Sequence, residues 1–275
     1  MQVAVEQRLT PEQDLKHALL QGQMHVHVQP QVDALDHEVG AELLLRWTHP
    51  VHGAVSPAQF IRIAEDTGVL VALGEFVLRQ ACQAMQMMAL GDHCVPMSVN
   101  VSPLQFRQDD FMQRVTAIVD ETGANASNLI FEVTEGLLIN NWRDVLQRTN
   151  ELAALGIHFS IDDVGTEYSS PGYLKKLPLY ELKIDKSFVQ DTPHDSSDAA
   201  IFKSIISVAR HLKLSVVAEG AETQDQADFL LANRCDCLQG YLYARLMPLQ
   251  HWLARRTASM PLQPADPSQH ARQTV

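Results

Sequence analysis

The sequence is short of cysteine and has no long apolar runs. Four cysteines in 275 residues are too few for a disulfide framework, and Cys235 and Cys237 lack the paired spacing of a zinc site. No apolar run approaches the length of a membrane span. The N-terminal residues show no basic stretch followed by an apolar core, so no signal peptide is indicated and a cytoplasmic protein is expected.

Basic residues are also in the minority. The chain has 21 Lys and Arg against 33 Asp and Glu, which gives a formal net charge of −12. Because contacts to nucleic-acid phosphates need Lys and Arg, we expect no binding to DNA or RNA polymers. A phosphate ligand would instead need metal ions to neutralise its charge. The 46% of hydrophobic residues is enough for a large core, and the length suits one (β/α) barrel or two smaller domains.

Apolar strand patterns alternate with amphipathic helix patterns over most of the chain. This alternation predicts an α/β fold with a mostly parallel, closed barrel. Residues 1–9 are expected to be an N-terminal extension, 10–257 the barrel domain, and 258–275 a disordered tail rich in Pro, Gln, Ser and Ala. Strands are predicted at 24–28, 39–47, 95–101, 129–134, 156–161, 179–184, 214–218 and 236–243. Helices are predicted at 10–22, 57–66, 75–90, 109–122, 145–155, 170–176, 201–212, 223–232 and 249–255.

Two adjacent aspartates, Asp162 and Asp163, end the strand at 156–161. Neighbouring carboxylates repel each other, and a bound divalent cation is a common way to offset that repulsion. A solvated turn with Asp at a helix N-cap is the alternative explanation. Other predicted strands favour the cation, because nearly all have a polar residue at or near their ends. These residues are Glu42, Asn100, Glu132, Asp162 with Asp163, Lys183, Glu219 and Gln239.

The carboxyl ends of barrel strands converge on one face, where the active sites of such barrels lie. Carboxylate and amide oxygens without His or Cys suit Mg²⁺ or Mn²⁺ better than zinc. Two such ions can activate a water and stabilise the entering and leaving oxygens of a phosphodiester displacement. A lysine among the carboxylates can orient the water or stabilise developing charge. The residues alone therefore indicate a metal-dependent phosphodiesterase.

The same residues resemble a known family, the EAL domain of bacterial cyclic di-GMP phosphodiesterases, over roughly residues 10–257. Several spaced motifs in the family's order make the resemblance specific. The motifs are Glu42-Leu43-Leu44-Leu45-Arg46-Trp47, Asn100-Val101-Ser102, Glu132-Val133-Thr134-Glu135, Asp162-Asp163-Val164-Gly165-Thr166, Leu182-Lys183-Ile184-Asp185, Val217-Ala218-Glu219-Gly220-Ala221-Glu222 and Gln239-Gly240-Tyr241.

The resemblance implies a modified TIM (β/α)8 barrel whose first strand is antiparallel. It also implies hydrolysis of cyclic di-GMP to linear pGpG with two Mg²⁺ or Mn²⁺ ions, and a homodimer. It assigns the first ion to Glu42, Asn100, Glu132 and Asp162, and the second to Asp162 and Asp163. It assigns catalytic roles at the attacking water or the neighbouring loop to Lys183, Glu219 and Glu135. It assigns substrate contacts to Arg46, Gln239, Gln29 and Leu44, and supporting roles to Asp185, Glu222 and Thr134.

Three departures from the family pattern are visible. The name-giving motif reads Glu-Leu-Leu, but the strand period places Leu43 opposite Glu42, so the metal site should be intact. The loop after Asp163 has Val164 where the family usually has Phe and Glu167 where it usually has Gly. Pro171-Gly172 then replaces a usual helix start. An altered loop at 164–172 leaves two alternatives to an active, weakened enzyme: a cyclic di-GMP receptor that does not cleave, and a protein-interaction module.

Overall fold

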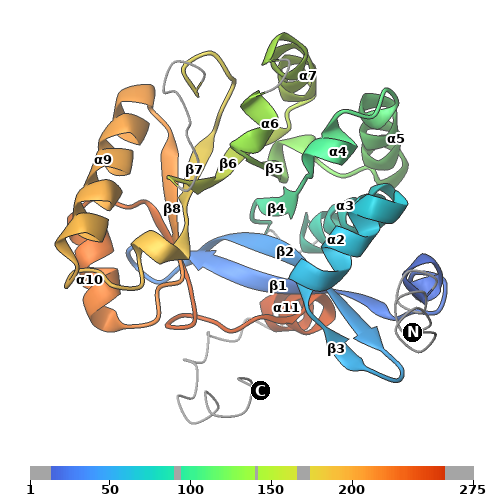
Figure 1. The fold of residues 1–275 in the computed structure, drawn as a ribbon, viewed down its shortest axis with the longest axis horizontal. Helices are drawn as coiled ribbons and strands as arrows, with labels where there is room; N and C mark the ends of the chain where they lie inside the picture. Colours follow the sequence, from blue (N-terminus) through green and yellow to red (C-terminus); the bar gives the residue numbers. More distant parts are fainter. Residues whose placement is uncertain (1–13, 90–93, 140–141, 166–173, 258–275) are drawn as a thin grey trace, which may run out of the picture.

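The computed structural model describes residues 14–89, 94–139, 142–165 and 174–257. Within these ranges the strands form one continuous sheet in the order β10-β1-β9-β8-β7-β6-β5-β4-β2-β3, and β1 also pairs with β2. Eight strands, β1, β2 and β4 to β9, therefore close into a barrel (Figure 1). The strands of the sheet are β1 Met24–Val32, β2 Glu38–His49, β3 Gly53–Val55, β4 Met97–Asn100, β5 Leu129–Thr134, β6 His158–Val164, β7 Glu181–Ile184, β8 Ser215–Glu219, β9 Cys237–Gln239 and β10 Met247–Pro248.

The first strand runs against its neighbours. β1 is antiparallel to both β2 and β9, whereas each pair from β2–β4 through β8–β9 is parallel. The tight hairpin between β1 and β2 explains this, because only antiparallel strands can be joined by so short a connection. The predicted modified barrel with an antiparallel first strand is confirmed.

The helices surround the barrel, with α9 and α10 on one side and α2 to α5 on the other (Figure 1). Their apolar faces and the outward-facing strand residues make the main core, which includes Leu43, Phe131 and Trp252. The strands of the closed barrel turn every second side chain inward, into the barrel interior. The helices are α2 Pro57–Thr67, α3 Leu70–Ala89, α4 Pro103–Phe106, α5 Phe111–Thr122, α6 Gly136–Ile139, α7 Trp142–Ala154, α9 Ser196–Leu212, α10 Gln224–Ala232 and α11 Leu249–Thr257, with 3-10 turns η1 Ala126–Asn128 and η2 Lys186–Phe188.

Most of the expected elements are present, with shifted ends. The helix expected from residue 75 begins at Leu70, and the strand expected at 236–243 ends at Gln239, where the chain turns. The hairpin strand β3, the short strand β10 and the one-turn helix α4 are not among the predicted elements. The expected extension 1–9, tail 258–275 and most of the helix at 170–176 lie outside the described residues. No helix in the described ranges is long and apolar enough to cross a membrane.

Candidate active site

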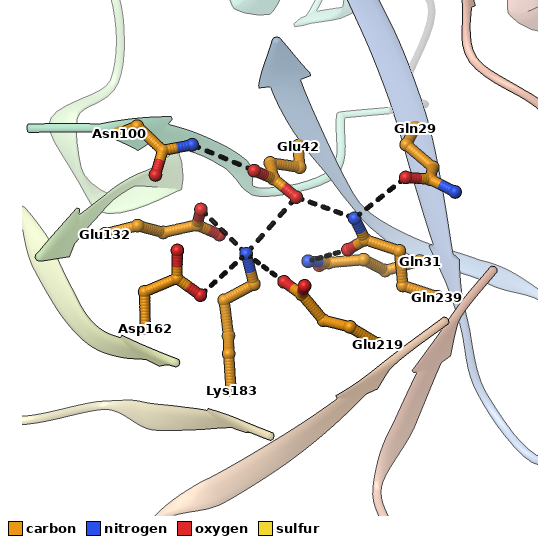
Figure 2. Close-up of polar contacts among 9 residues, drawn as sticks. All are labelled: Gln29, Gln31, Glu42, Asn100, Glu132, Asp162, Lys183, Glu219 and Gln239. Carbon is orange, nitrogen blue, oxygen red and sulfur yellow. Dashed lines mark hydrogen bonds and ion pairs between the residues drawn. The ribbon is translucent and has the colours of Figure 1, made fainter. Parts of the chain in front are cut away.

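A buried lysine stands at the centre of the acidic cluster at the barrel mouth (Figure 2). Lys183 on β7 places its Nζ 2.9 Å from Glu132 Oε2 and 2.5 Å from Glu219 Oε1. The same nitrogen lies 3.2 Å from Glu42 Oε2 and 3.4 Å from Asp162 Oδ1. Side chains from five strands of the barrel wall, β2 and β5 to β8, thus meet at one ammonium group, because the carboxyl ends of these strands converge there.

Glu42 is held by two amides in addition to the lysine. Asn100 on β4 donates its Nδ2 to Glu42 Oε1 at 2.8 Å, and Gln239 on β9 donates its Nε2 to Glu42 Oε2 at 2.6 Å. Gln239 Nε2 also lies 3.2 Å from Gln29 Oε1 on β1. The predicted strand-end residues are therefore brought together, and Glu42 links the carboxylates to the amides (Figure 2).

The cluster has more negative than positive charge. Burial acts to lower the pKa of Lys183, but its four carboxylate neighbours raise that pKa well above the usual value, so the lysine is charged. Burial and the charge of Glu42 raise the pKa of Glu132 well above its usual value. Burial likewise raises the pKa of Glu219 to about 7. One ammonium cannot compensate four carboxylates, of which Glu42 and Glu132 are buried and the other two partly exposed, so the site favours additional positive charge.

The second aspartate of the pair is re-aimed by an irregularity in the strand. The β6–β7 register shifts between Ile161 and Val164, and Asp163 adopts a φ of 54°. Such a bulge changes the direction of a side chain, and Asp tolerates the left-handed region better than most residues. Burial, Asp162 and Asp185 raise the pKa of Asp163 to about 6. Asp163 thus joins the acidic cluster instead of alternating to the opposite face.

The donor set fits a hard divalent cation. Glu132 Oε1 is buried without a hydrogen-bond partner among the described residues, and the surrounding groups supply carboxylate and amide oxygens. Such oxygen donors suit Mg²⁺ or Mn²⁺. Within the described ranges, no three His, Cys, Asp or Glu side chains lie close enough together to hold a metal ion without rearrangement. The ammonium of Lys183 occupies the position between the carboxylates, and their charge excess provides the attraction for an ion.

Two cavities adjoin the cluster. One of about 420 Å³ is lined by Glu42, Asn100 and Asp162 together with Leu44 and Arg46. The other, of about 210 Å³, is lined by residues that include Gln29, Lys186, Glu219, Glu222, Gln239 and Tyr241. The acidic cluster therefore lies between two spaces that can each accept part of a ligand.

The remaining predicted residues are placed as follows. Thr134 lines the larger cavity, and Glu135 is buried just after β5. Asp185 caps η2 by accepting the backbone N–H of Ser187 at 3.0 Å, and also contacts Asp163. Glu167 and Pro171-Gly172, on which the prediction of a weakened loop rests, lie outside the described residues, as does most of the loop that Glu135 is predicted to anchor.

One buried polar residue of the site is missing from the predicted set. Gln31 on β1 donates its Nε2 to Gln239 Oε1 at 3.0 Å and is 3% exposed. It lies two residues after Gln29, so the strand period places both glutamines on the same face. That spacing is a visible signal, although it does not reveal the contact with Gln239 on the far end of the chain.

Comparison with known proteins agrees with this geometry. The EAL domain family matches residues 12–246. The chain is 42% identical over 256 residues to the bifunctional diguanylate cyclase/cyclic di-GMP phosphodiesterase MucR of Pseudomonas aeruginosa, covering 92% of this chain and 37% of MucR. It is 39% identical over 249 residues to the cyclic di-GMP phosphodiesterase NbdA of the same organism, covering 90% of this chain and 32% of NbdA. The chain thus spans about a third of the length of these curated relatives.

Solved structures show the same likeness. The MucR phosphodiesterase in complex with cyclic di-GMP superposes with a TM-score of 0.85 at 42% identity, covering 88% of this chain and 99% of that structure. The EAL enzyme Bd1971, bound to cyclic AMP and cyclic di-GMP, superposes with a TM-score of 0.85 at 29% identity, covering 91% of this chain and 69% of that structure. The chain belongs to the EAL domain family of cyclic di-GMP phosphodiesterases.

Proposed function

We propose that this chain hydrolyses cyclic di-GMP to linear pGpG with the help of two Mg²⁺ or Mn²⁺ ions. The observation that supports this most directly is the acidic cluster around Lys183, whose charge excess and unpartnered Glu132 oxygen suit bound cations. Membership of the family, and the cyclic di-GMP bound to the MucR relative, support the choice of substrate.

The residues that would hold the cations are those on the carboxylate side of the site. Glu42, Asn100, Glu132 and Asp162 would hold one ion, and Asp162 and Asp163 the other. When bound, the ions supply Lewis-acid activation of a water molecule and neutralise the charge of the phosphodiester. Asn100 and Gln239 orient Glu42 through hydrogen bonds, which prepares this ligand before an ion arrives.

The proton chemistry belongs to Lys183 and Glu219. Hydrolysis forms a bond between the water oxygen and phosphorus and breaks the bond between phosphorus and the ribose O3′. The leaving O3′ takes a proton from solvent, which balances the proton that Glu219 removes from the attacking water. Glu219 takes the proton of the water, and its pKa of about 7, raised by burial, allows that exchange near neutral pH. Lys183 donates hydrogen bonds to the attacking water and stabilises the charge that develops on the phosphate.

The two cavities suit the two nucleotide halves of a cyclic dinucleotide. Leu44 offers an apolar wall in the larger cavity, and Arg46, whose pKa is lowered by burial, offers a half-buried cation for a phosphate oxygen. Gln29, Gln239 and Tyr241 offer hydrogen-bonding and stacking groups in the smaller one. We further propose that the enzyme acts in the cytoplasm, and that it forms the homodimer that the family resemblance implies.

The test is turnover of cyclic di-GMP with Mg²⁺ and with Mn²⁺, following pGpG by chromatography. We expect product from the parent chain, none from Glu42→Ala, and parental turnover from Glu151→Ala, which removes an exposed glutamate on α7. Binding by calorimetry without product would support a receptor instead. Neither binding nor product would contradict both nucleotide functions and favour a protein-interaction module.

A further inference from the structure

Gln31 is the first member of a row of amides that ends on Glu42 (Figure 2). Gln31 Nε2 donates to Gln239 Oε1 at 3.0 Å, and Gln239 Nε2 donates to Glu42 Oε2 at 2.6 Å. Gln31 and Gln239 are each 3% exposed, so water competes little for these bonds. The row joins the hairpin strands β1 and β2 to β9, which lies about 200 residues later in the sequence.

The direction of the row follows from the chemistry of its ends. An ionised carboxylate only accepts hydrogen bonds, so Gln239 must present its NH₂ group to Glu42. The oxygen of the same amide then points away from Glu42 and needs a donor, which Gln31 supplies. If the Gln239 amide turned over, its oxygen would face the Glu42 carboxylate, and two acceptors would repel each other.

A glycine on the facing strand makes room for Gln31. Gly40 on β2 pairs with Gln31 in the β1–β2 ladder. A Cβ atom added to Gly40 would lie 2.4 Å from Gln31 Oε1. Glycine within a strand is typical of positions where another group approaches closely. Gly40 lies two residues before Glu42, so the glycine and the metal-ligand candidate share one face of β2.

We propose that Gln31, seated in the space left by Gly40, is a positioning residue that fixes the orientation of the Gln239 amide and thereby the affinity of Glu42 for a divalent cation. This inference rests on the proposed function, in which Glu42 is a metal ligand. Partners behind a metal ligand commonly affect metal affinity by roughly 10–100-fold when they are replaced. Gln31 would act on the metal ligand Glu42 indirectly, through its hydrogen bond to Gln239.

Three variants separate this role from simple packing. Gln31→Glu keeps the size of the side chain but replaces the donor by an acceptor, so it should turn the Gln239 amide over. Gln31→Met keeps the length of the side chain and removes the hydrogen-bond donor, but it does not force the Gln239 amide to turn over. Gly40→Ala leaves the Gln31 residue unchanged but displaces the end of its side chain. That side chain is flexible enough to move without disturbing the backbone.

The measurement is the Mn²⁺ dissociation constant of the metal-free protein, followed by electron paramagnetic resonance. We expect Gln31→Glu to weaken binding roughly tenfold, Gly40→Ala to weaken it less, and Gly40→Ala to add nothing in the Gln31→Met background. An added negative charge would by itself tighten Mn²⁺ binding. Unchanged or tighter binding in Gln31→Glu, or additive effects of the Gly40 and Gln31 changes, would therefore overturn the proposal.

A second readout needs no metal and no turnover. The side-chain amide signal of Gln239 in ¹⁵N-glutamine-labelled, metal-free protein can be assigned by its loss in Gln239→Leu. We expect this signal to move in Gln31→Glu and to stay in Gln83→Glu, which makes the same chemical change at an exposed position on α3. A signal that stays in both would contradict the positioning role.

The two readouts also distinguish the inference from the proposed function. A parent chain that binds Mn²⁺ but releases no pGpG contradicts the proposed hydrolysis, while the Gln31 series still decides the positioning role. A parent chain that binds no Mn²⁺ contradicts both the metal function and the effect of Gln31 on it.

Discussion

Three strands of the barrel each place two polar side chains on their inner face, two residues apart. The mouth layer consists of Asn100, Asp162 and Lys183 on β4, β6 and β7. The inner layer, two residues earlier on the same strands, consists of Ser98, Ser160 and Glu181. The inner layer is buried, whereas in the mouth layer only Lys183 is buried, Asp162 is partly exposed and Asn100 is exposed. Lys183 pairs with four carboxylates and Asn100 donates to Glu42 at 2.8 Å. Ser98 Oγ and Glu181 Oε1, in contrast, have no hydrogen-bond partner among the described residues.

The two layers deal with burial in different ways. In the mouth layer the ammonium of Lys183 compensates part of the carboxylate charge, and the rest leaves an excess of negative charge. In the inner layer, burial raises the pKa of Glu181 to about 7, so its carboxyl group keeps a proton up to near neutral pH. The comparison teaches that one barrel can hold a charged ammonium among carboxylates at its mouth and keep a lone carboxyl group protonated a single step deeper.

The largest expected effect follows from removing the compensating charge. Lys183→Met leaves four carboxylates around an apolar side chain, and loss of one partner of a buried ion pair costs about 3–5 kcal/mol of unfolding free energy. We expect this loss in metal-free buffer at pH 8, a smaller loss at pH 6 where the carboxylates take up protons, and partial recovery with Mn²⁺. Urea denaturation measures it.

The matched control is Lys175→Met, which removes an exposed lysine. It should change the unfolding free energy by less than about 0.5 kcal/mol. If Lys183→Met were no more costly than this control, Lys183 would not be the compensating charge of the mouth layer.

The carboxylates of the acidic cluster around Lys183 could be predicted from the sequence because the rule behind them is simple. Strand-end residues of a parallel barrel meet at one face, so Glu132, Asp162 and Glu219 could be grouped without knowing any distance. The antiparallel first strand came from the resemblance to the family. Only the grouping of strand ends depends on topology that the alternation of strand and helix patterns reveals.

Other features depend on distances that no pattern contains. Strand period alone would send Asp163 to the face opposite Asp162, and only the bulge in β6 brings it back. In the sequence, Gln31 is not distinguished from other strand residues. Its role becomes visible only in the structure, where β9 places Gln239 against it. Lys183 could be assigned to the site, but its position between four carboxylates results from the stagger of the barrel strands.

An intermediate effect is expected from the acid of the inner layer. The carboxyl of Glu181 ionises near 4.5 when exposed and near 7 in the fold, mainly because of burial. A raised pKa contributes stability that is fully present below pH 4.5 and is lost as the pH rises to about 7. Glu181→Gln does not ionise, so its unfolding free energy relative to the parent should rise by up to about 3 kcal/mol between pH 4.5 and pH 8.

Denaturation of both proteins by urea at pH 4.5 and pH 8 measures this difference. The same change at the exposed Glu151, Glu151→Gln, should show no such pH dependence. Parallel pH profiles for Glu181→Gln and the parent would mean that the inner layer holds an ionised carboxylate, and the contrast between the layers would fail.

The smallest effect concerns a hydroxyl group. Ser98 Oγ is buried and unpartnered within the described residues, so Ser98→Ala removes a desolvated group without breaking a hydrogen bond. We expect the unfolding free energy to stay the same or rise by up to about 1 kcal/mol. Ser102→Ala is the contrasting change, just after β4. It does break a hydrogen bond, because Ser102 Oγ accepts the backbone N–H of Gln105 at 3.2 Å as the N-cap of α4.

Loss of such a cap costs about 1 kcal/mol. Thermal and urea denaturation of the two serine variants should therefore give effects of opposite sign, or at least an effect of Ser102→Ala that exceeds that of Ser98→Ala. If Ser98→Ala were as costly as Ser102→Ala, the Ser98 hydroxyl would have a bound partner, such as a buried water. The inner layer would then be a hydrogen-bonded network like the mouth, and the two layers would differ in charge alone.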